Sequence, residues 1–325
     1  MVGRLAATIA AAVGLSAASA TATDAPQVRF PRDHFGHPRA SIEWWYFTAL
    51  ARDAANTPYS VFFTLFSSEG AIVPVAQVRN LESGALVGHS EQLAFARVSP
   101  SSLDVRLSHA RLRYEPATNA WLFSASGSGF AVSIRQRPDK AYALHGGGTG
   151  LIRQSLAGIA HYYSATRMRA AGTLHDGGTK ITLTGESWLD HQWGDYRADP
   201  RAFNWDWFSC RFDDDSELML YQFRDRTTGR PLTRFRNGTY VTRRGRTIAI
   251  TDFQARRGRR VLQAAGHRWP LDWQLRVPKL GLSEDLRALL RDQLVRNRIV
   301  PTFWEGVARA TGTRSGACFV ELSYR

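Results

Sequence analysis

The sequence predicts an all-β protein whose antiparallel strands form barrels or sandwiches. Segments in which apolar and polar residues alternate recur through the middle and the end of the chain, and glycine, asparagine, aspartate and proline separate them. Many short strands joined by turns are typical of these architectures. The composition is that of an ordinary globular protein, with 44% hydrophobic and 22% charged residues, and 325 residues suffice for two domains.

The first segment of the chain is expected to be removed. Residues 1–20 place one arginine before an alanine-rich apolar run, and the sequence around Ala20 fits a signal-peptide cleavage site. The mature protein is therefore expected to be soluble and either secreted or periplasmic. A membrane anchor is the alternative, although the apolar run is short for a membrane span.

Strands are expected in both halves of the chain, and one helix near its end. Ser283 can cap a helix over residues 283–297, in which Leu286, Leu289, Leu290 and Leu294 form one apolar stripe. The expected strand segments are 41–50, 59–68, 103–115, 121–138, 180–189, 203–225, 238–257 and 316–325. The glycine-rich segment at 145–150 is interpreted as a flexible turn.

A polar segment with glycine and proline, Gly194–Asn204, is the predicted domain boundary. Segments 43–66 and 204–223 both place an acid beside tryptophan in a strand that a turn connects to a second strand. Two copies of a similar sheet unit would explain this. The predicted domains are therefore 28–194 and 195–325.

Three acidic residues lie among tryptophans: Glu43, Asp190 and Asp206. Apolar surroundings raise the pKa of a carboxyl group, and such a group can act as a general acid near neutral pH. Tryptophan faces could also line a hydrophobic cavity and stabilise a carbocation. The alternative for each acid is a structural role, with hydrogen bonds from indole nitrogens or arginine.

Strand periodicity predicts which of these side chains share a face. Glu43 and Trp45 point one way in segment 41–50, and Trp44 and Tyr46 point the other way. His191 shares a face with Trp193 and lies opposite Asp190, which makes His191 either a domain-interface histidine or a proton-transfer group.

Metal and cofactor binding are not predicted. His34 and His37 have H-x-x-H spacing, but Pro38 follows them and indicates an extended loop, with no E-x-x-H motif or cysteine pair nearby. The sequence has no dinucleotide fingerprint or P-loop, and segment 185–189 lacks the last glycine of a serine-hydrolase motif. Cys210 and Cys318 could pair in an oxidising compartment or remain two buried thiols.

The net charge of +14 does not indicate nucleic acid as the partner of an exported protein. The basic clusters at 243–246 and 256–260 straddle glycines, as in solvated turns. A weak association with an anionic membrane surface is compatible with this charge. The sequence does not distinguish a monomer from a homodimer.

Three segments together resemble the carotenoid 1,2-hydratase and AttH-like family, many of whose members are described as secreted hydrolases. They are FPRDHFGHPRASIEWWYFTAL (30–50), GESWLDHQWGDY (185–196) and FNWDWFSCRFDDDSELMLYQFRD (203–225). FWEGVARATG (303–312) and the final FVELSYR extend the resemblance to the end of the chain. Ala49 departs from the glycine that many members have there, so a side chain could crowd this strand.

The resemblance implies two lipocalin-like β-domains packed together, with a ligand site in their interior or interface and Glu43 facing a tryptophan-lined cavity or the other domain. It implies a hydratase or hydrolase acting on a hydrophobic terpenoid- or polyene-like molecule. A carboxylic acid would protonate a double bond, a tertiary cation would form beside aromatic rings, and water would add. A carrier that binds a lipid or other hydrophobic molecule without reaction is the alternative.

The expected catalytic residues fall in two groups. Asp190, His191 and Trp193 match the D-H-x-W block of the family, and Glu43 and Asp206 follow as further acids. The expected substrate-binding residues are the aromatic side chains of the same segments: Trp44, Trp45, Tyr46, Trp205 and Trp207.

Overall fold

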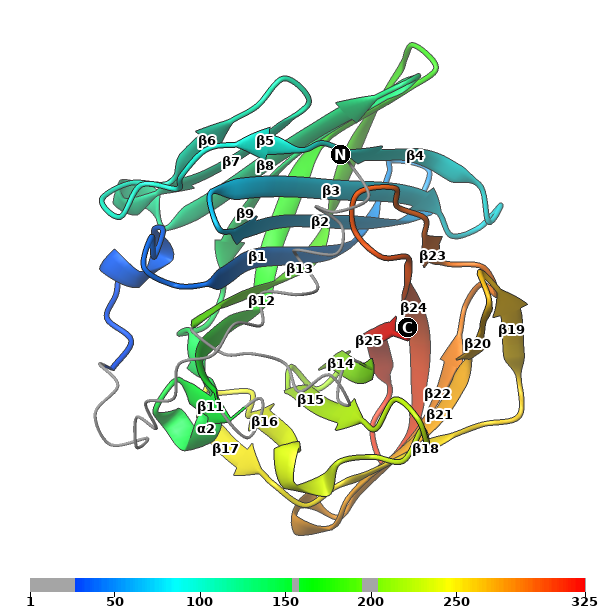
Figure 1. Cartoon of the computed structure of the whole chain (residues 1–325). Coiled ribbons are helices and arrows are strands. Elements are labelled where there is room, and N and C mark those ends of the chain that lie inside the picture. Colours follow the sequence, from blue (N-terminus) through cyan, green and yellow to red (C-terminus); the bar gives the residue numbers. More distant parts are fainter. Residues whose placement is uncertain (1–26, 154–157, 195–203, 325) are drawn as a thin grey trace.

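The computed structural model describes residues 27–153, 158–194 and 204–324, and these form two curled antiparallel sheets that face each other (Figure 1). This confirms the predicted all-β, lipocalin-like class. The predicted signal peptide and most of the predicted boundary segment lie outside the described residues, so the domain division stays a prediction. No helix in the described ranges is long and apolar enough to cross a membrane.

The first sheet contains the strands before the segment 195–203. Within the described residues its main path runs β4-β3-β2-β1-β13-β12-β9-β8-β7-β6, and β5, β10 and β11 pair at its sides. The strands are β1 (Ile42–Arg52), β2 (Pro58–Ser68), β3 (Ala71–Asn80), β4 (Leu86–Glu91), β5 (Ala94–Phe95), β6 (Asp104–Arg106), β7 (Ala110–Glu115), β8 (Ala120–Gly127), β9 (Phe130–Pro138), β10 (Ala143–Leu144), β11 (Leu151–Arg153), β12 (Ile159–Asp176) and β13 (Thr179–Gly194).

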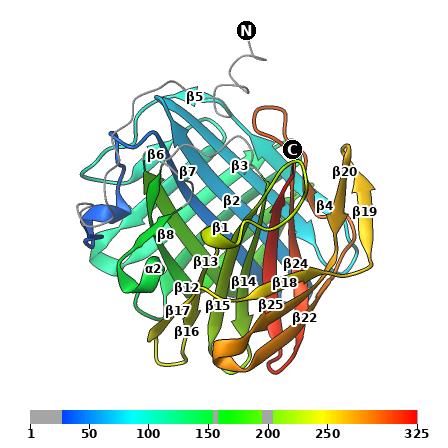
Figure 2. The same cartoon turned by 60° about the horizontal axis from the view of Figure 1, so that its bottom comes forward.

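The second sheet contains strands that follow this segment. Its path in the described part is β17-β16-β15-β14-β25-β24-β22-β21-β18, with β23 beside β24 and a separate pair β19-β20 (Figure 2). The strands are β14 (Asn204–Phe212), β15 (Glu217–Arg224), β16 (Asn237–Val241), β17 (Thr247–Ile250), β18 (Gln254–Arg257), β19 (Val261–Ala264), β20 (His267–Pro270), β21 (Asp272–Val277), β22 (Leu282–Ala288), β23 (Leu294–Val295), β24 (Phe303–Gly312) and β25 (Gly316–Ser323).

Short helical turns punctuate the strands. The 3-10 turns are η1 (Arg32–His34), η2 (Pro116–Thr118), η3 (Thr233–Phe235) and η4 (Pro278–Leu280). The glycine-rich segment predicted as a flexible turn forms the helical turn α2 (His145–Gly148), and φ angles of 63° at Gly146 and 76° at Gly147 favour glycine there. His145 is buried and contacts the Ser164 hydroxyl at 2.7 Å and the Thr239 hydroxyl at 2.8 Å, so α2 connects the two sheets.

The central strands are apolar on both faces because both faces are buried. Each sheet encloses a core of its own, and a third apolar cluster fills the space between the sheets. Within this third cluster, the Tyr46 and Trp207 rings lie 5.2 Å apart, and Phe62 contacts Phe303 at 5.6 Å between ring centroids. Burial on two sides explains why β1 contains an almost continuous apolar run.

The helix predicted over 283–297 is wrong. Residues Leu282–Ala288 form β22, in which buried and exposed positions alternate strictly, and Leu289 is 47% exposed. Leu286 and Leu290 fit a strand as well as a helix over so short a stretch, but Leu289 fits only the helix. Pairing with β21 on one side and β24 on the other selects the strand, since both neighbours supply backbone hydrogen bonds.

A disulfide joins Cys210 to Cys318, which the sequence left undecided. The two residues lie directly opposite each other on β14 and β25, and both are fully buried. The bond connects positions 108 residues apart, so it restricts the unfolded chain strongly.

Replacing both cysteines with alanine is expected to lower the free energy of unfolding by about 2–4 kcal/mol. Urea titration of the variant and the wild type, each with and without reductant, measures this difference. Reductant should shift the wild-type midpoint toward that of the variant and leave the variant unchanged. Equal midpoints for the oxidised wild type and the variant would contradict a stabilising crosslink.

Candidate functional site

Strands β1 and β13 carry the predicted site residues on two opposite faces. Tyr46 lies opposite Asp190 in the antiparallel pairing, Trp45 opposite His191, and Glu43 opposite Trp193. Strand periodicity therefore directs Asp190 and Tyr46 toward the second sheet and Glu43 and His191 toward the interior of the first. The predicted residues thus separate into two clusters, and the face assignments made from the sequence agree with the structure.

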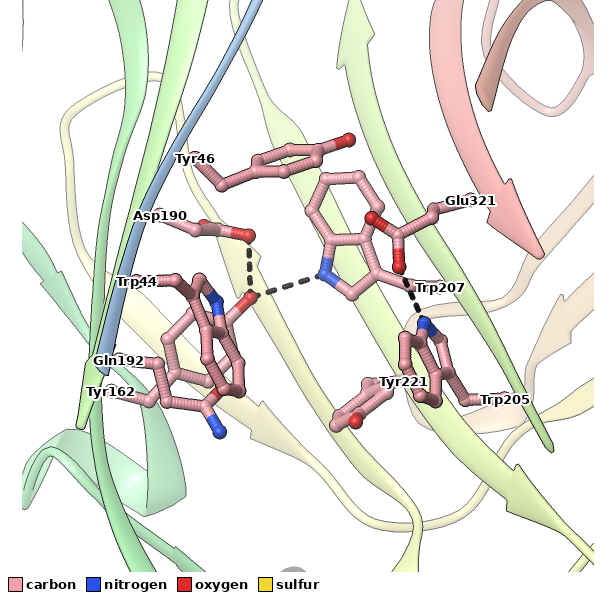
Figure 3. A pocket seen from close by; sticks show the side chains of 9 residues that line it. All are labelled: Trp44, Tyr46, Tyr162, Asp190, Gln192, Trp205, Trp207, Tyr221 and Glu321. Atoms are coloured by element: carbon pink, nitrogen blue, oxygen red, sulfur yellow. Dashed lines mark hydrogen bonds between the residues drawn. The ribbon is translucent and has the colours of Figure 1, made fainter. Parts of the chain in front are cut away.

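The first cluster, here called the interface pocket, lies between the two sheets (Figure 3). Asp190 and Tyr162 extend from the first sheet, and Glu321 and Trp205 extend from the second. The space among the side chains is about 40 Å³, room for roughly three water molecules. The lining residues are Trp44, Tyr46, Tyr162, Asp190, Gln192, Trp205, Trp207, Tyr221 and Glu321.

Asp190 is held by three hydrogen-bond donors. Tyr162 Oη donates to Oδ2 at 2.7 Å, Trp188 Nε1 donates to Oδ1 at 2.7 Å, and the Ser164 hydroxyl donates to Oδ1 as well. Burial raises the pKa of Asp190 to about 6, although the bonds from Ser164, Tyr162 and Trp188 lower it in part. The carboxyl group is therefore fixed in orientation and can exchange a proton near neutral pH.

Glu321 faces Asp190 from β25 and has fewer hydrogen bonds. Trp205 Nε1 donates to Oε1, and burial together with the charge of Asp190 raises the pKa of Glu321 to about 7. Glu305 lies directly opposite Glu321 on β24. Burial and the neighbouring Glu321 raise the pKa of Glu305 well above its usual value, and neither of its oxygens meets a hydrogen-bond partner within the described residues. Carboxyl groups thus concentrate at this part of the interface.

The second cluster, here called the inner cluster, consists of His37, Glu43 and His191 in the interior of the first sheet. Glu43 Oε1 lies 2.7 Å from His37 Nδ1 and 2.8 Å from His191 Nε2. Burial would raise the pKa of Glu43, but these two histidines lower it. The lowered pKa favours the ionised form of Glu43, which can accept from both rings, and burial lowers the pKa of His191 to about 4. Glu43 does not face the second sheet.

Trp45 and Trp193 pack against the inner cluster. Trp45 stacks on His191 at 4.5 Å between ring centroids, and Trp193 stacks on His37 at 3.9 Å. Trp45 is fully buried and donates from Nε1 to the His34 carbonyl at 3.2 Å. Neither indole lines the interface pocket, so the predicted substrate-binding set contributes Trp44, Tyr46, Trp205 and Trp207 to it.

Asp206 is separate from both clusters. It points into the core of the second sheet, where the Arg224 guanidinium bonds to it, Gln222 Nε2 donates at 2.8 Å and Tyr324 Oη donates at 2.7 Å. Both carboxylate oxygens are thus occupied, and the residue is fully buried. This environment is that of a structural ion pair.

Sequence reasoning missed several pocket residues, and it did not predict the strand β12 that carries one of them, Tyr162. Tyr162, Gln192 and Tyr221 complete the walls, and Glu321 supplies the second carboxyl group. A signal for Glu321 exists in the last strand. Val320 and Leu322 point into the second core while Phe319 and Glu321 share the other face, so a lone acid occupies a position that the alternation predicts to be buried.

The comparisons with known proteins cover nearly the whole chain. The family model for AttH-like proteins matches residues 21–324. No curated protein matches the sequence.

Three solved structures resemble the fold. A protein named as an AttH candidate from Nitrosomonas europaea has a TM-score of 0.84 at 23% identity, and the match covers 92% of this chain and 98% of that one. Kievitone hydratase from Nectria haematococca has a TM-score of 0.78 at 18% identity, covering 93% and 94%. CghA has a TM-score of 0.54 at 12% identity, covering 92% and 94%. Because the family model matches residues 21–324 of the 325, the chain belongs to the AttH-like family.

Proposed function

We propose that the interface pocket adds water to a carbon–carbon double bond of a hydrophobic terpenoid-like, polyene or prenylated substrate. The observation that carries this proposal is the pair of carboxyl groups, buried Asp190 and half-buried Glu321, on opposite sides of a pocket lined by indole rings. One protein of similar fold is named kievitone hydratase, which is consistent with hydration chemistry on this scaffold. Export of the enzyme by way of residues 1–20 is part of the proposal.

The two carboxyl groups have different environments and therefore different roles. Asp190 receives three hydrogen bonds, which favour its ionised form, whereas Glu321 receives one from an indole. When the environments of two carboxyl groups move their pKa values apart in this way, one group acts as the acid and the other as the base. Glu321 is the proton donor and Asp190 is the base that orients and deprotonates water.

The reaction proceeds through a cation beside the aromatic rings. The π electrons of the double bond form a new C–H bond with the Glu321 proton, which leaves a tertiary carbocation and a Glu321 carboxylate. The faces of Trp207 and Trp205 stabilise this cation. Water then forms the C–O bond, Asp190 takes the proton that this water releases, and that proton returns to Glu321 before the next turnover.

The size of the pocket limits which part of the substrate enters it. A space of about 40 Å³ accommodates the attacking water but no polyene. Trp44 and Trp205 are half-buried at the pocket, so these two rings can move aside for the reacting end of the substrate. The remainder of the molecule would lie on their outer faces.

A direct test incubates the purified chain with prenylated phenols and linear polyenes in water labelled with heavy oxygen. Mass spectrometry then follows both bound and released molecules over time. Gain of one labelled water by a substrate supports the proposal. A molecule that stays bound and unchanged in mass would replace it with a carrier function, and cleavage into two fragments would indicate a hydrolase.

Replacing Glu321 with glutamine is expected to alter how stability depends on pH. The folded-state pKa of about 7 exceeds the ordinary value of 4.5. Protonated Glu321 therefore stabilises the fold fully below about pH 4.5, and this contribution is lost as the pH rises through about 7. The free energy of unfolding of the variant relative to the wild type should increase by at most about 3 kcal/mol between pH 4.5 and 8.

Urea titrations at several pH values measure this difference. The groups around Glu321 are Asp190, Glu305, Tyr46 and Tyr221, and all of them remain in the variant. Glu82→Gln, a change at an exposed carboxyl group, is the matched control and should give a parallel curve. A constant difference between Glu321→Gln and the wild type across this range would contradict a raised pKa.

A further inference from the structure

The two histidines of the H-x-x-H motif form hydrogen bonds to different side chains in the structure. His34 Nδ1 turns away to the Tyr163 hydroxyl at 2.7 Å, whereas His37 joins Glu43 and His191. Two imidazoles and one carboxylate, drawn from a loop and two strands, thus meet at one point. This is a ligand set that proteins use for zinc and for iron(II) with an open coordination position.

We propose that His37 Nδ1, Glu43 Oε1 and His191 Nε2 bind one divalent transition-metal ion. The three atoms lie within 4.8 Å of one another. Ligands of a tetrahedral zinc ion at its usual bond lengths are about 3.3 Å apart. The hydrogen bonds of 2.7 and 2.8 Å that Glu43 Oε1 now makes would therefore lengthen by roughly half an ångström.

The surroundings of the three ligands resemble the outer shell of a metal site. The second nitrogen of His37 lies 3.3 Å from Asp33 Oδ1, and the second nitrogen of His191 lies 3.0 Å from the Tyr163 hydroxyl. Metal-binding histidines usually make such a bond to a carboxylate or another oxygen, which fixes the ring. The backbone N–H of His37 donates to Glu43 Oε2 at 2.9 Å, which leaves Oε1 for the ion.

The rings are also held by packing, and the site is accessible. Trp193 lies parallel to His37 with an angle of 5° between the planes, and Trp45 stacks on His191 at 22°. His37 and Glu43 line a pocket of about 280 Å³ that is separate from the interface pocket. An ion can reach the ligands through it, and the open coordination position would face this pocket.

The test uses the full chain purified without a histidine tag, with cobalt(II) and zinc as probes. Visible absorption of the cobalt(II) complex and calorimetry with zinc should show one ion bound per chain, with cobalt(II) bands typical of low coordination number. His37→Gln and Glu43→Gln should each weaken binding by more than about 100-fold, because loss of an outer partner alone costs about 10- to 100-fold. Asp33→Asn should fall in that smaller range.

Exposed histidines provide the matched controls. His109→Gln and His175→Gln remove rings that could bind ions adventitiously, and neither change should alter the affinity. Circular dichroism verifies that each variant is folded, and the wild-type spectrum tests the site even if Glu43→Gln fails to fold. Absence of saturable binding to the wild type, or binding that survives in folded His37→Gln, would overturn the proposal. Neither result would bear on hydration at the interface pocket.

Discussion

Replacing Asp190 with asparagine is expected to reduce turnover by about 100- to 10,000-fold, the usual contribution of a positioned general base or acid. The amide has the shape of the carboxyl group, and its oxygen can still accept from Ser164 and Trp188. Its nitrogen would face Tyr162, whose hydroxyl already accepts from Trp207 Nε1 at 3.1 Å and can accept again. The variant should therefore fold and bind substrate while it loses proton transfer.

The measurement is the rate of labelled-water incorporation for the variant and the wild type at saturating substrate. Asp213→Asn, a change of the same chemistry at an exposed position, is the matched control and should retain the wild-type rate. Equal binding with a lower rate assigns Asp190 to the chemical step. A variant that turns over at the wild-type rate would exclude Asp190 as the base.

Strand periodicity predicted much of the architecture that positions these groups. The alternation in residues 41–50 placed Glu43 with Trp45 and Trp44 with Tyr46, and the structure has the same division. Alternation with a period of two determines which side chains share a face, because a shift of the strand by one residue would move every side chain to the opposite face. Residues 283–297 were misassigned because the helical stripe relied on Leu289, which is exposed, whereas residues 282–288 alternate as a strand that pairs with β21 and β24.

The site could be predicted only in part, because its walls come from both sheets. Acids flanked by tryptophans identified β1 and β13 as strands of a candidate site, because this pattern lies within one short stretch of each strand. Glu321 contributes through its position opposite Asp190, and that juxtaposition depends on how the two sheets pack. The meeting of the three inner-cluster residues was missed for a different reason, since it arises within the first sheet. His37 and His191 are distant in sequence, and only the pairing of β1 with β13 unites them at Glu43.

Asp206 shows how one sequence pattern can serve a different purpose. It lies between Trp205 and Trp207, as Glu43 and Asp190 lie near tryptophans, yet strand alternation turns it away from the interface pocket. Arg224 and Tyr324 then occupy its two oxygens. The neighbours that decide its role are brought to it by β15 and by the end of the chain.

Replacing Asp206 with alanine is expected to lower the free energy of unfolding by about 3–5 kcal/mol, since removal of one partner leaves a buried charge uncompensated. Arg224 is only 5% exposed and keeps one hydrogen bond to the Gly229 carbonyl, at 2.9 Å. The Tyr324 hydroxyl also loses its acceptor. Urea unfolding followed by tryptophan fluorescence measures the loss.

A second variant separates the ion pair from the rest of the core. Asp206→Leu combined with Arg224→Met removes both charges, and it should recover most of the stability that Asp206→Ala loses, because apolar replacements of a buried pair are often tolerated. Folded material of either variant should keep hydration activity, since Asp206 does not line the interface pocket. If Asp206→Ala instead had wild-type stability and no activity, the carboxylate would act in catalysis, and the arrangement around Arg224 would have to open during turnover.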